Sequence, residues 1–109
     1  MHELAIAESV VGAVVDKVGD GPVLAVRVEV GRLSGVVADS LLFCFEFVVN
    51  GTGLEGARLE IDEPPGRAYC RTCGDEFVLD DPIMLCPCGS ADLEVLSGQQ
   101  LRILSVEVP

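Results

Sequence analysis

Apolar residues in the first part of the chain recur every three or four positions. Side chains at this spacing share one face of a helix, so the pattern predicts an amphipathic helix over 3–18. The segment GDGP at 19–22 ends the helix, because glycine accepts left-handed backbone angles and proline cannot continue a helix. The residues of the apolar face are Leu4, Ala7, Val11, Val14 and Val18.

Alternation of apolar and polar residues replaces the helical spacing at 24–30, where the sequence reads LAVRVEV. Successive side chains of a strand point to opposite faces, so this segment predicts a half-buried strand. The segment ARLEIDEP at 57–64 alternates in the same way, and short strands are expected over 93–96 and 101–108 with a turn at 97–98 between them. The inner face of the first strand comprises Leu24, Val26, Val28 and Val30.

A second helix is expected between the first two strands, because apolar residues return there to helical spacing. Asp39 or Ser40 is expected to cap its start, and the helix extends to about Val49, before the segment NGTG at 50–53. These elements predict an α+β fold class in which two helices pack on a small, mostly antiparallel or mixed sheet.

Four of the five cysteines lie within residues 70–88 and form two close pairs. Close cysteine pairs in a reducing compartment are more often metal ligands than disulfides. Zinc takes four ligands in a tetrahedron with Zn–S bonds of about 2.3 Å, which sets neighbouring sulfurs about 3.8 Å apart. We therefore expect an inserted, zinc-ribbon-like subdomain over 67–92 that is too small to bury a core of its own and folds around structural Zn(II). The expected ligands are Cys70, Cys73, Cys86 and Cys88.

The second cysteine pair is C-x-C rather than C-x-x-C, so the chain must bend at Pro87 to bring its two sulfurs together. Gly74 and Gly89 follow the two pairs and permit left-handed turns beside the sulfurs. A redox dithiol at Cys70 and Cys73 is the alternative, but such a motif normally opens a helix, and a glycine follows the second cysteine here.

The remaining cysteine, Cys44, lies between two phenylalanines with no histidine or basic residue nearby in sequence. These surroundings indicate a buried small hydrophobic residue rather than a nucleophile.

Composition narrows the classes of function. The chain has 109 residues and a formal net charge of −11, from 7 basic and 18 acidic residues. This charge argues against binding to nucleic acid or to anionic membranes. No apolar run approaches the roughly 18 residues of a membrane span, and the first residues do not resemble a secretory signal, so a cytoplasmic location is expected.

An enzyme is not expected, because the sequence offers no nucleophile with a nearby base and no cofactor cradle. Its single histidine, His2, begins a segment reading His-Glu, but Ile6 stands where the zinc-protease motif needs a second histidine. The acidic residues that could be mistaken for catalytic carboxylates are read as surface or turn residues: Glu60, Asp62, Glu63, Asp80 and Asp81.

The amino end Met1-His2-Glu3 concentrates nitrogen donors. An α-amine, an imidazole and the backbone amides between them suit Ni²⁺ or Cu²⁺, which favour planar or tetragonal nitrogen ligands. From the residues alone, the competing interpretation is that His2 belongs to a frayed terminus and that Glu3 complements the helix dipole.

Several motifs together resemble the HypA/HybF family of nickel metallochaperones, over essentially the whole chain. They are Met1-His2-Glu3-Leu4, GRLSGV at 31–36, CPCGS at 86–90 and LRILSVEV at 101–108. The resemblance implies a nickel-binding α/β domain over 1–66 and 93–109, with a zinc-binding insert over 67–92. The C-x-C pair departs from the usual family form, which has two intervening residues.

The resemblance also implies roles for individual residues. His2 would bind Ni(II) in transit, with the Met1 amine and the backbone amides of His2 and Glu3 as co-ligands, and the Glu3 side chain would tune binding or transfer. The four cysteines would hold Zn(II). The implied partners are a HypB-type GTPase and the large subunit of a nickel–iron hydrogenase, with urease served in some organisms, and the family pattern leaves both a monomer and a homodimer open.

A second hypothesis needs no nickel. In it the chain is a zinc-ribbon adaptor for protein interactions, the four-cysteine site is kept, and His2 is incidental. Metal titration of the zinc-loaded protein separates the two hypotheses.

Overall fold

The two predicted helices are confirmed. In the computed structural model, which describes residues 2–80 and 83–109, helix α1 spans Glu3–Val18 and helix α2 spans Ala38–Val48. The expected capping of α2 by Asp39 or Ser40 is wrong, since the N-cap residue is Val37 and Asp39 lies in the first turn. The apolar face of α2 sets its start, because Leu41 and Phe45 must point into the core.

The first sheet has the strand order β2-β1-β6, with strands Ala25–Val30 (β1), Arg58–Asp62 (β2) and Leu101–Glu107 (β6). Strand β2 runs parallel to β1 because α2 forms the crossover between them, whereas β6 is antiparallel to β1. The sheet is therefore mixed, as expected from the sequence.

Both helices contribute apolar side chains to a core shared with the first sheet, while charged side chains such as Arg27 and Asp62, 3.0 Å apart, remain exposed. Leu24, expected on the inner face, instead precedes β1 and is 45% exposed. Among the described residues, the eleven buried members of this main core are Ala7, Val11, Val14, Val23, Val26, Val28, Val30, Leu41, Phe45, Val49 and Leu54.

A second, antiparallel sheet contains the strands Gly66–Cys70 (β3), Glu76–Leu79 (β4) and Leu93–Ser97 (β5) in the order β4-β3-β5. The sequence did not predict β3 or β4. The inward positions of β3 are Gly66, Ala68 and Cys70, whose small side chains hide the alternation. The adjacent strands β5 and β6 lie in different sheets, so the segment between them links the two units instead of closing a hairpin.

This part of the chain contributes to a small core, but it does not form that core alone. Leu33, Ala68 and Leu79 form a small buried cluster, against which Phe77 and Met84 pack. Leu33 comes from outside the insert, between β1 and α2, and this long-range contribution could not be seen in the local sequence.

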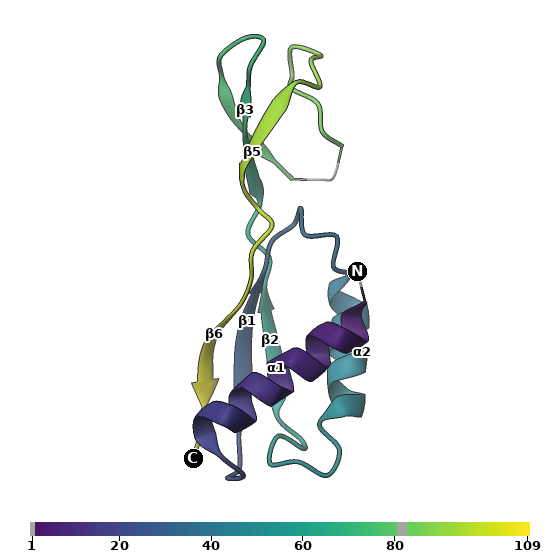
Figure 1. Ribbon diagram of the computed structural model, residues 1–109, viewed down its shortest axis with the longest axis vertical. Helices are drawn as coiled ribbons and strands as arrows, with labels where there is room; N and C mark the ends of the chain where they lie inside the picture. Colours follow the sequence, from purple (N-terminus) through teal and green to yellow (C-terminus); the bar gives the residue numbers. More distant parts are fainter. Residues whose placement is uncertain (1, 81–82) are drawn as a thin grey trace.

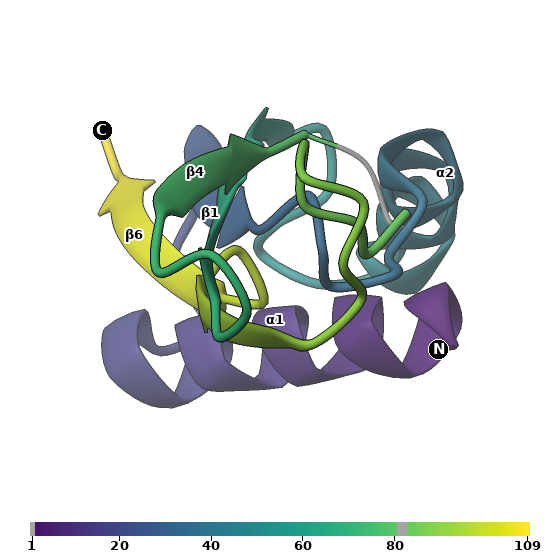
Figure 2. The same ribbon diagram turned by 90° about the horizontal axis from the view of Figure 1, so that it is seen from above.

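The two sheets lie end to end, so the molecule is elongated (Figure 1). Its principal extents are 52 × 21 × 17 Å, and its radius of gyration is 16.8 Å, against about 13 Å for a compact domain of this length. Seen along the long axis, the second sheet lies over the first, and α1 crosses below both (Figure 2). Within the described residues, neither helix is long and apolar enough to cross a membrane.

Candidate metal centres

The four cysteines of the second unit meet at one point. Their sulfur atoms all lie within 4.8 Å of one another. The Sγ atoms of Cys70 and Cys88 are 3.8 Å apart, and those of Cys73 and Cys86 are 3.6 Å apart. These distances match the separation of about 3.8 Å that a tetrahedral zinc ion requires, so the donor set fits the expected ion.

Two turns of similar form present the sulfurs. After each pair, a glycine has a positive φ angle, +81° at Gly74 and +94° at Gly89, as the sequence predicts. The amide of Cys73 donates to the sulfur of Cys70 at 3.5 Å, and the amide of Cys88 donates to the sulfur of Cys86 at 3.4 Å. The short C-x-C pair therefore keeps an amide–sulfur hydrogen bond, because Pro87 and Cys88 form a turn.

Contacts beside the sulfurs hold the two turns together. The Thr72 and Ser90 hydroxyls are 2.8 Å apart, and the Arg71 guanidinium donates to the Asp92 carboxylate at 3.0 Å. Cys70 and Cys86 are buried, whereas Cys73 and Cys88 are exposed. The site is thus fixed on its inner side and open on its outer side, where an ion can enter.

The crowded sulfurs differ in proton affinity. The pKa of Cys70 falls to about 6, chiefly because its sulfur accepts the amide hydrogen of Cys73. The Cys88 amide lowers the pKa of Cys86, but burial and the nearby sulfurs have the larger opposite effect and raise it to about 12. A thiolate at one position therefore opposes ionisation of the neighbouring thiols. A divalent cation bound among the sulfurs would offset this repulsion and allow all of them to ionise.

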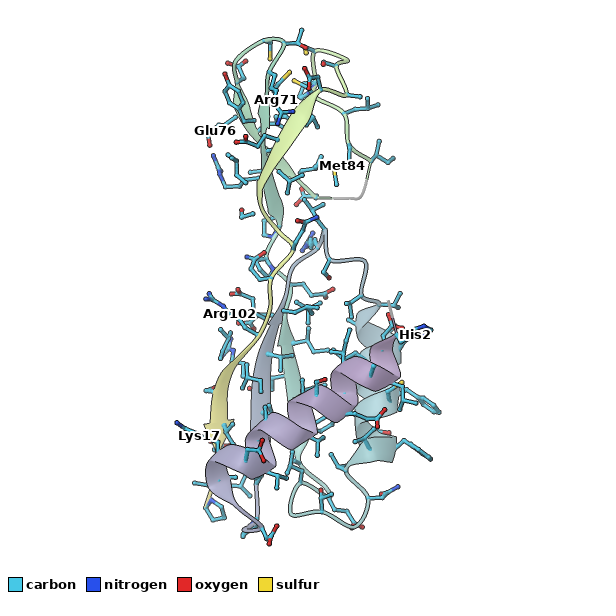
Figure 3. All side chains as sticks on the ribbon, in the orientation of Figure 1. His2, Lys17, Arg71, Glu76, Met84 and Arg102 are labelled. Atoms are coloured by element: carbon cyan, nitrogen blue, oxygen red, sulfur yellow. The ribbon has the colours of Figure 1, made fainter. Side chains whose placement is uncertain are left out.

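The candidate nickel residues lie at the start of α1, in the other unit. His2 is the N-cap of the helix and has an extended backbone conformation, with φ −89° and ψ 106°. The His2 side chain is exposed. In Figure 3 it lies in a different part of the molecule from Arg71, the residue that follows Cys70 in the sequence. Met1 lies outside the described residues. The structure therefore separates the candidate nickel residues from the cysteine cluster.

Two surface depressions meet at His2. An apolar groove of about 620 Å³ runs from His2 between α1 and strands β1 and β6. A second depression, of about 510 Å³, is lined by His2, Glu3, Asp39 and Cys44, among others. Cys44 is half-buried and packs against the main core, so it is less buried than expected.

The Glu3 carboxylate makes a long-range contact that sequence reasoning missed. It accepts the backbone N–H of Val37 at 3.1 Å, and this hydrogen bond lowers the pKa of Glu3, with a smaller contribution from the amide of Glu3 itself. The two residues are 34 positions apart, so no local pattern predicts the contact.

The sequence analysis interpreted five acidic residues as surface or turn groups, and the structure places Asp62 and Asp80 on the surface as expected. Asp62 pairs with Arg27, and Asp80, whose side chain is 66% exposed, lies 3.6 Å from Arg32. Asp81 lies outside the described residues.

The model of a protein family described as hydrogenase/urease nickel incorporation, metallochaperone, hypA, matches residues 1–108. The chain belongs to the HypA family. Named relatives agree with this assignment. A hydrogenase maturation factor HypA from Geobacter metallireducens is 47% identical over 109 residues, covering 99% of each chain. One from a Nostoc species is 44% identical over 108 residues, covering 99% of this chain and 96% of the relative.

The fold of the HypA family is confirmed by a solved structure. The solution structure of the Ni metallochaperone HypA from Helicobacter pylori superposes with a TM-score of 0.66 and 22% identity, covering 98% of this chain and 97% of that one. The family is described as one of metallochaperones for nickel incorporation into hydrogenase or urease, and a cluster of four thiols fits a protein that binds metal.

Proposed function

We propose that this protein carries Ni(II) on its amino end and delivers it to the apoenzyme of a nickel–iron hydrogenase during maturation. The match to the HypA family over residues 1–108 carries the proposal. Nickel is the cargo here, so its site must both bind and release it. An exposed, terminal site with a single imidazole suits exchange better than storage.

The nickel ligands in this proposal are the Met1 amine, the His2 imidazole and the backbone amides of His2 and Glu3. The helical geometry supports the use of these amides. The first intrahelical hydrogen bond of α1 is donated by the Ile6 amide to the His2 carbonyl. The amides before Ile6, including those of His2 and Glu3, therefore have no backbone acceptor within the helix and are free of that bond when nickel binds.

Zinc is the proposed ion of the four-cysteine site, held by Cys70, Cys73, Cys86 and Cys88. Bound there, it would neutralise the crowded thiolates and stabilise the second unit. The residues of strand β5 pair with β3, so we propose a boundary near Gly98 instead of the one after residue 92. The nickel-binding unit would then comprise 1–65 and 98–109.

The proposed partners are those of hydrogenase maturation: a HypB-type GTPase and the hydrogenase large subunit, with urease and its accessory proteins as further clients. The family description, which names both hydrogenase and urease, supports these clients. A cytoplasmic location is proposed with them, since a reducing compartment keeps thiols available for metal.

Metal titration tests the proposed function. Untagged, zinc-loaded protein and its His2→Ala variant are titrated with Ni(II) by calorimetry, and zinc content and circular dichroism are recorded for both. We expect the variant to lose stoichiometric nickel binding and to keep its zinc and its helical signal. Equal nickel affinity in the two proteins would refute the site and favour the zinc-ribbon adaptor.

A further inference from the structure

Helix α2 takes a hydrogen-bond acceptor at its start from the other helix. Its N-cap residue, Val37, has no side-chain oxygen to offer the helix. The Glu3 carboxylate, from the first turn of α1, accepts the Val37 N–H at 3.1 Å. This bond joins the first turn of α1 to the first turn of α2, and it is formed by the side chain of a residue whose backbone amide is a proposed nickel ligand.

The segment that carries Val37, here called the strap (residues 31–37), is fixed at its other end. The amides of Gly31 and Leu33 donate to the carbonyls of Gln100 and Gly98, each at 2.8 Å. The Leu33 side chain is only 8% exposed and belongs to the core of the second unit. The Val37 N–H is therefore a donor on a segment already held in place.

Gly66 and Gly98 show how closely the strap fits. A Cβ atom added to Gly66 would collide with the Leu33 side chain, whereas one added to Gly98 would collide first with the backbone, 2.5 Å from the Gly66 Cα atom. Glycine at these two positions therefore allows the chain and the Leu33 side chain to approach closely. The buried Leu33 side chain and the two backbone hydrogen bonds hold this end of the strap in place.

A chelate formed by consecutive backbone nitrogens requires residues 1–3 to adopt one conformation. Ordering them when the ion binds costs conformational entropy, and ordering them beforehand reduces that cost. The Glu3–Val37 hydrogen bond fixes the third residue of this tripeptide, while His2 already has extended backbone angles.

We propose that Glu3 is a positioning residue, whose carboxylate does not ligate nickel but fastens the start of α1 to the strap, so that His2 and Glu3 are ordered before the ion binds. The inference rests on the proposed function. A ligand role for the same carboxylate would require it to leave the Val37 amide, so the two roles predict different responses to substitution.

Three variants separate these roles. Glu3→Ala removes the acceptor, Glu3→Gln keeps an acceptor oxygen without the charge, and Val37→Pro removes the donor hydrogen while leaving the carboxylate in place. Val37→Ala is the matched control for the proline variant, since the Val37 side chain is 56% exposed. Each variant is titrated with Ni(II) in the zinc-loaded state, and the absorption spectrum of the nickel complex is recorded.

We expect Glu3→Ala and Val37→Pro each to weaken nickel binding about fivefold, the effect of one helix-capping hydrogen bond, and the double variant to be no weaker. Glu3→Gln should recover most of the affinity lost in Glu3→Ala, and the nickel spectrum should be the same in all of them. A shifted spectrum and full loss in Glu3→Gln, with normal binding by Val37→Pro, would make the carboxylate a ligand and overturn the inference.

Hydrogen exchange in the nickel-free, zinc-loaded protein tests the hydrogen bond without using nickel. The Val37 amide should exchange more slowly in the wild type and Glu3→Gln than in Glu3→Ala, and equal rates would also overturn the inference. This readout does not depend on the folding of the proline variant. Retained nickel binding by His2→Ala would refute the proposed function instead, so the two failures are distinguishable.

Discussion

Single residues determine the geometry of both candidate centres. Gly74 and Gly89 turn the chain beside the sulfurs, and His2 precedes α1 as its N-cap with an extended backbone. The clustering of the four cysteines was predictable because their spacing is local and typical of zinc sites. The contacts of Glu3 with Val37 and of Leu33 with Gly66 were not predictable, because each joins segments about 33 positions apart and leaves no local pattern.

Substitution of Gly66 by alanine tests the packing at the junction between the two units. The new Cβ would collide with Leu33 and approach the Leu79 carbonyl oxygen to 3.1 Å, so we expect a loss of about 1–3 kcal/mol in the free energy of unfolding. Gly12→Ala is the control, because no atom lies within 4 Å of its added Cβ and alanine favours the helix. Thermal unfolding of both zinc-loaded variants is the measurement; equal or higher stability of Gly66→Ala would contradict this account of the junction.

At the level of elements, the helices and the first sheet follow from apolar periodicity, because large side chains mark their inner faces. Strand β3 was missed since glycine, alanine and cysteine occupy its inner positions. The start of α2 was misplaced by two or three residues, because its acceptor comes from α1 instead of a neighbouring Asp39 or Ser40 side chain.

Two phenylalanines of α2 test which face of this helix holds the fold together. Phe45 is 1% exposed in the main core, whereas Phe43 is 74% exposed. We expect Phe45→Ala to lower the free energy of unfolding by about 3–5 kcal/mol and Phe43→Ala to change it by about 0.5 kcal/mol or less. Chemical denaturation followed by circular dichroism measures both, and similar losses in the two variants would be inconsistent with the described core.

At the scale of the whole molecule, the two units are stabilised in different ways. Counted over residues 2–80 and 83–109, the unit of the first sheet has eleven buried core residues, whereas the second has three, one of them supplied by the strap. The sequence predicted the presence of two parts but not the second sheet, because the strand partners there come from separated segments. We therefore expect the proposed zinc ion to contribute more to the stability of the second unit than nickel contributes to that of the first.

Removal of zinc by a strong chelator tests this difference. We expect the amide signals of β3, β4 and β5 to lose dispersion in a two-dimensional NMR spectrum, while those of α1 and α2 keep their positions and the helical circular dichroism persists. Re-addition of zinc should restore the spectrum. Either complete unfolding of both units or an unchanged second unit would contradict the account.

In the proposed function, nickel is held by nitrogen donors at the amino end and not by the sulfurs of the cysteine cluster. X-ray absorption at the nickel edge distinguishes these two sets of ligands in the untagged, zinc-loaded protein with one equivalent or less of Ni(II). We expect nearest neighbours of nitrogen and oxygen alone, with the imidazole signature absent in His2→Ala. Sulfur atoms bound to nickel would refute the proposed site.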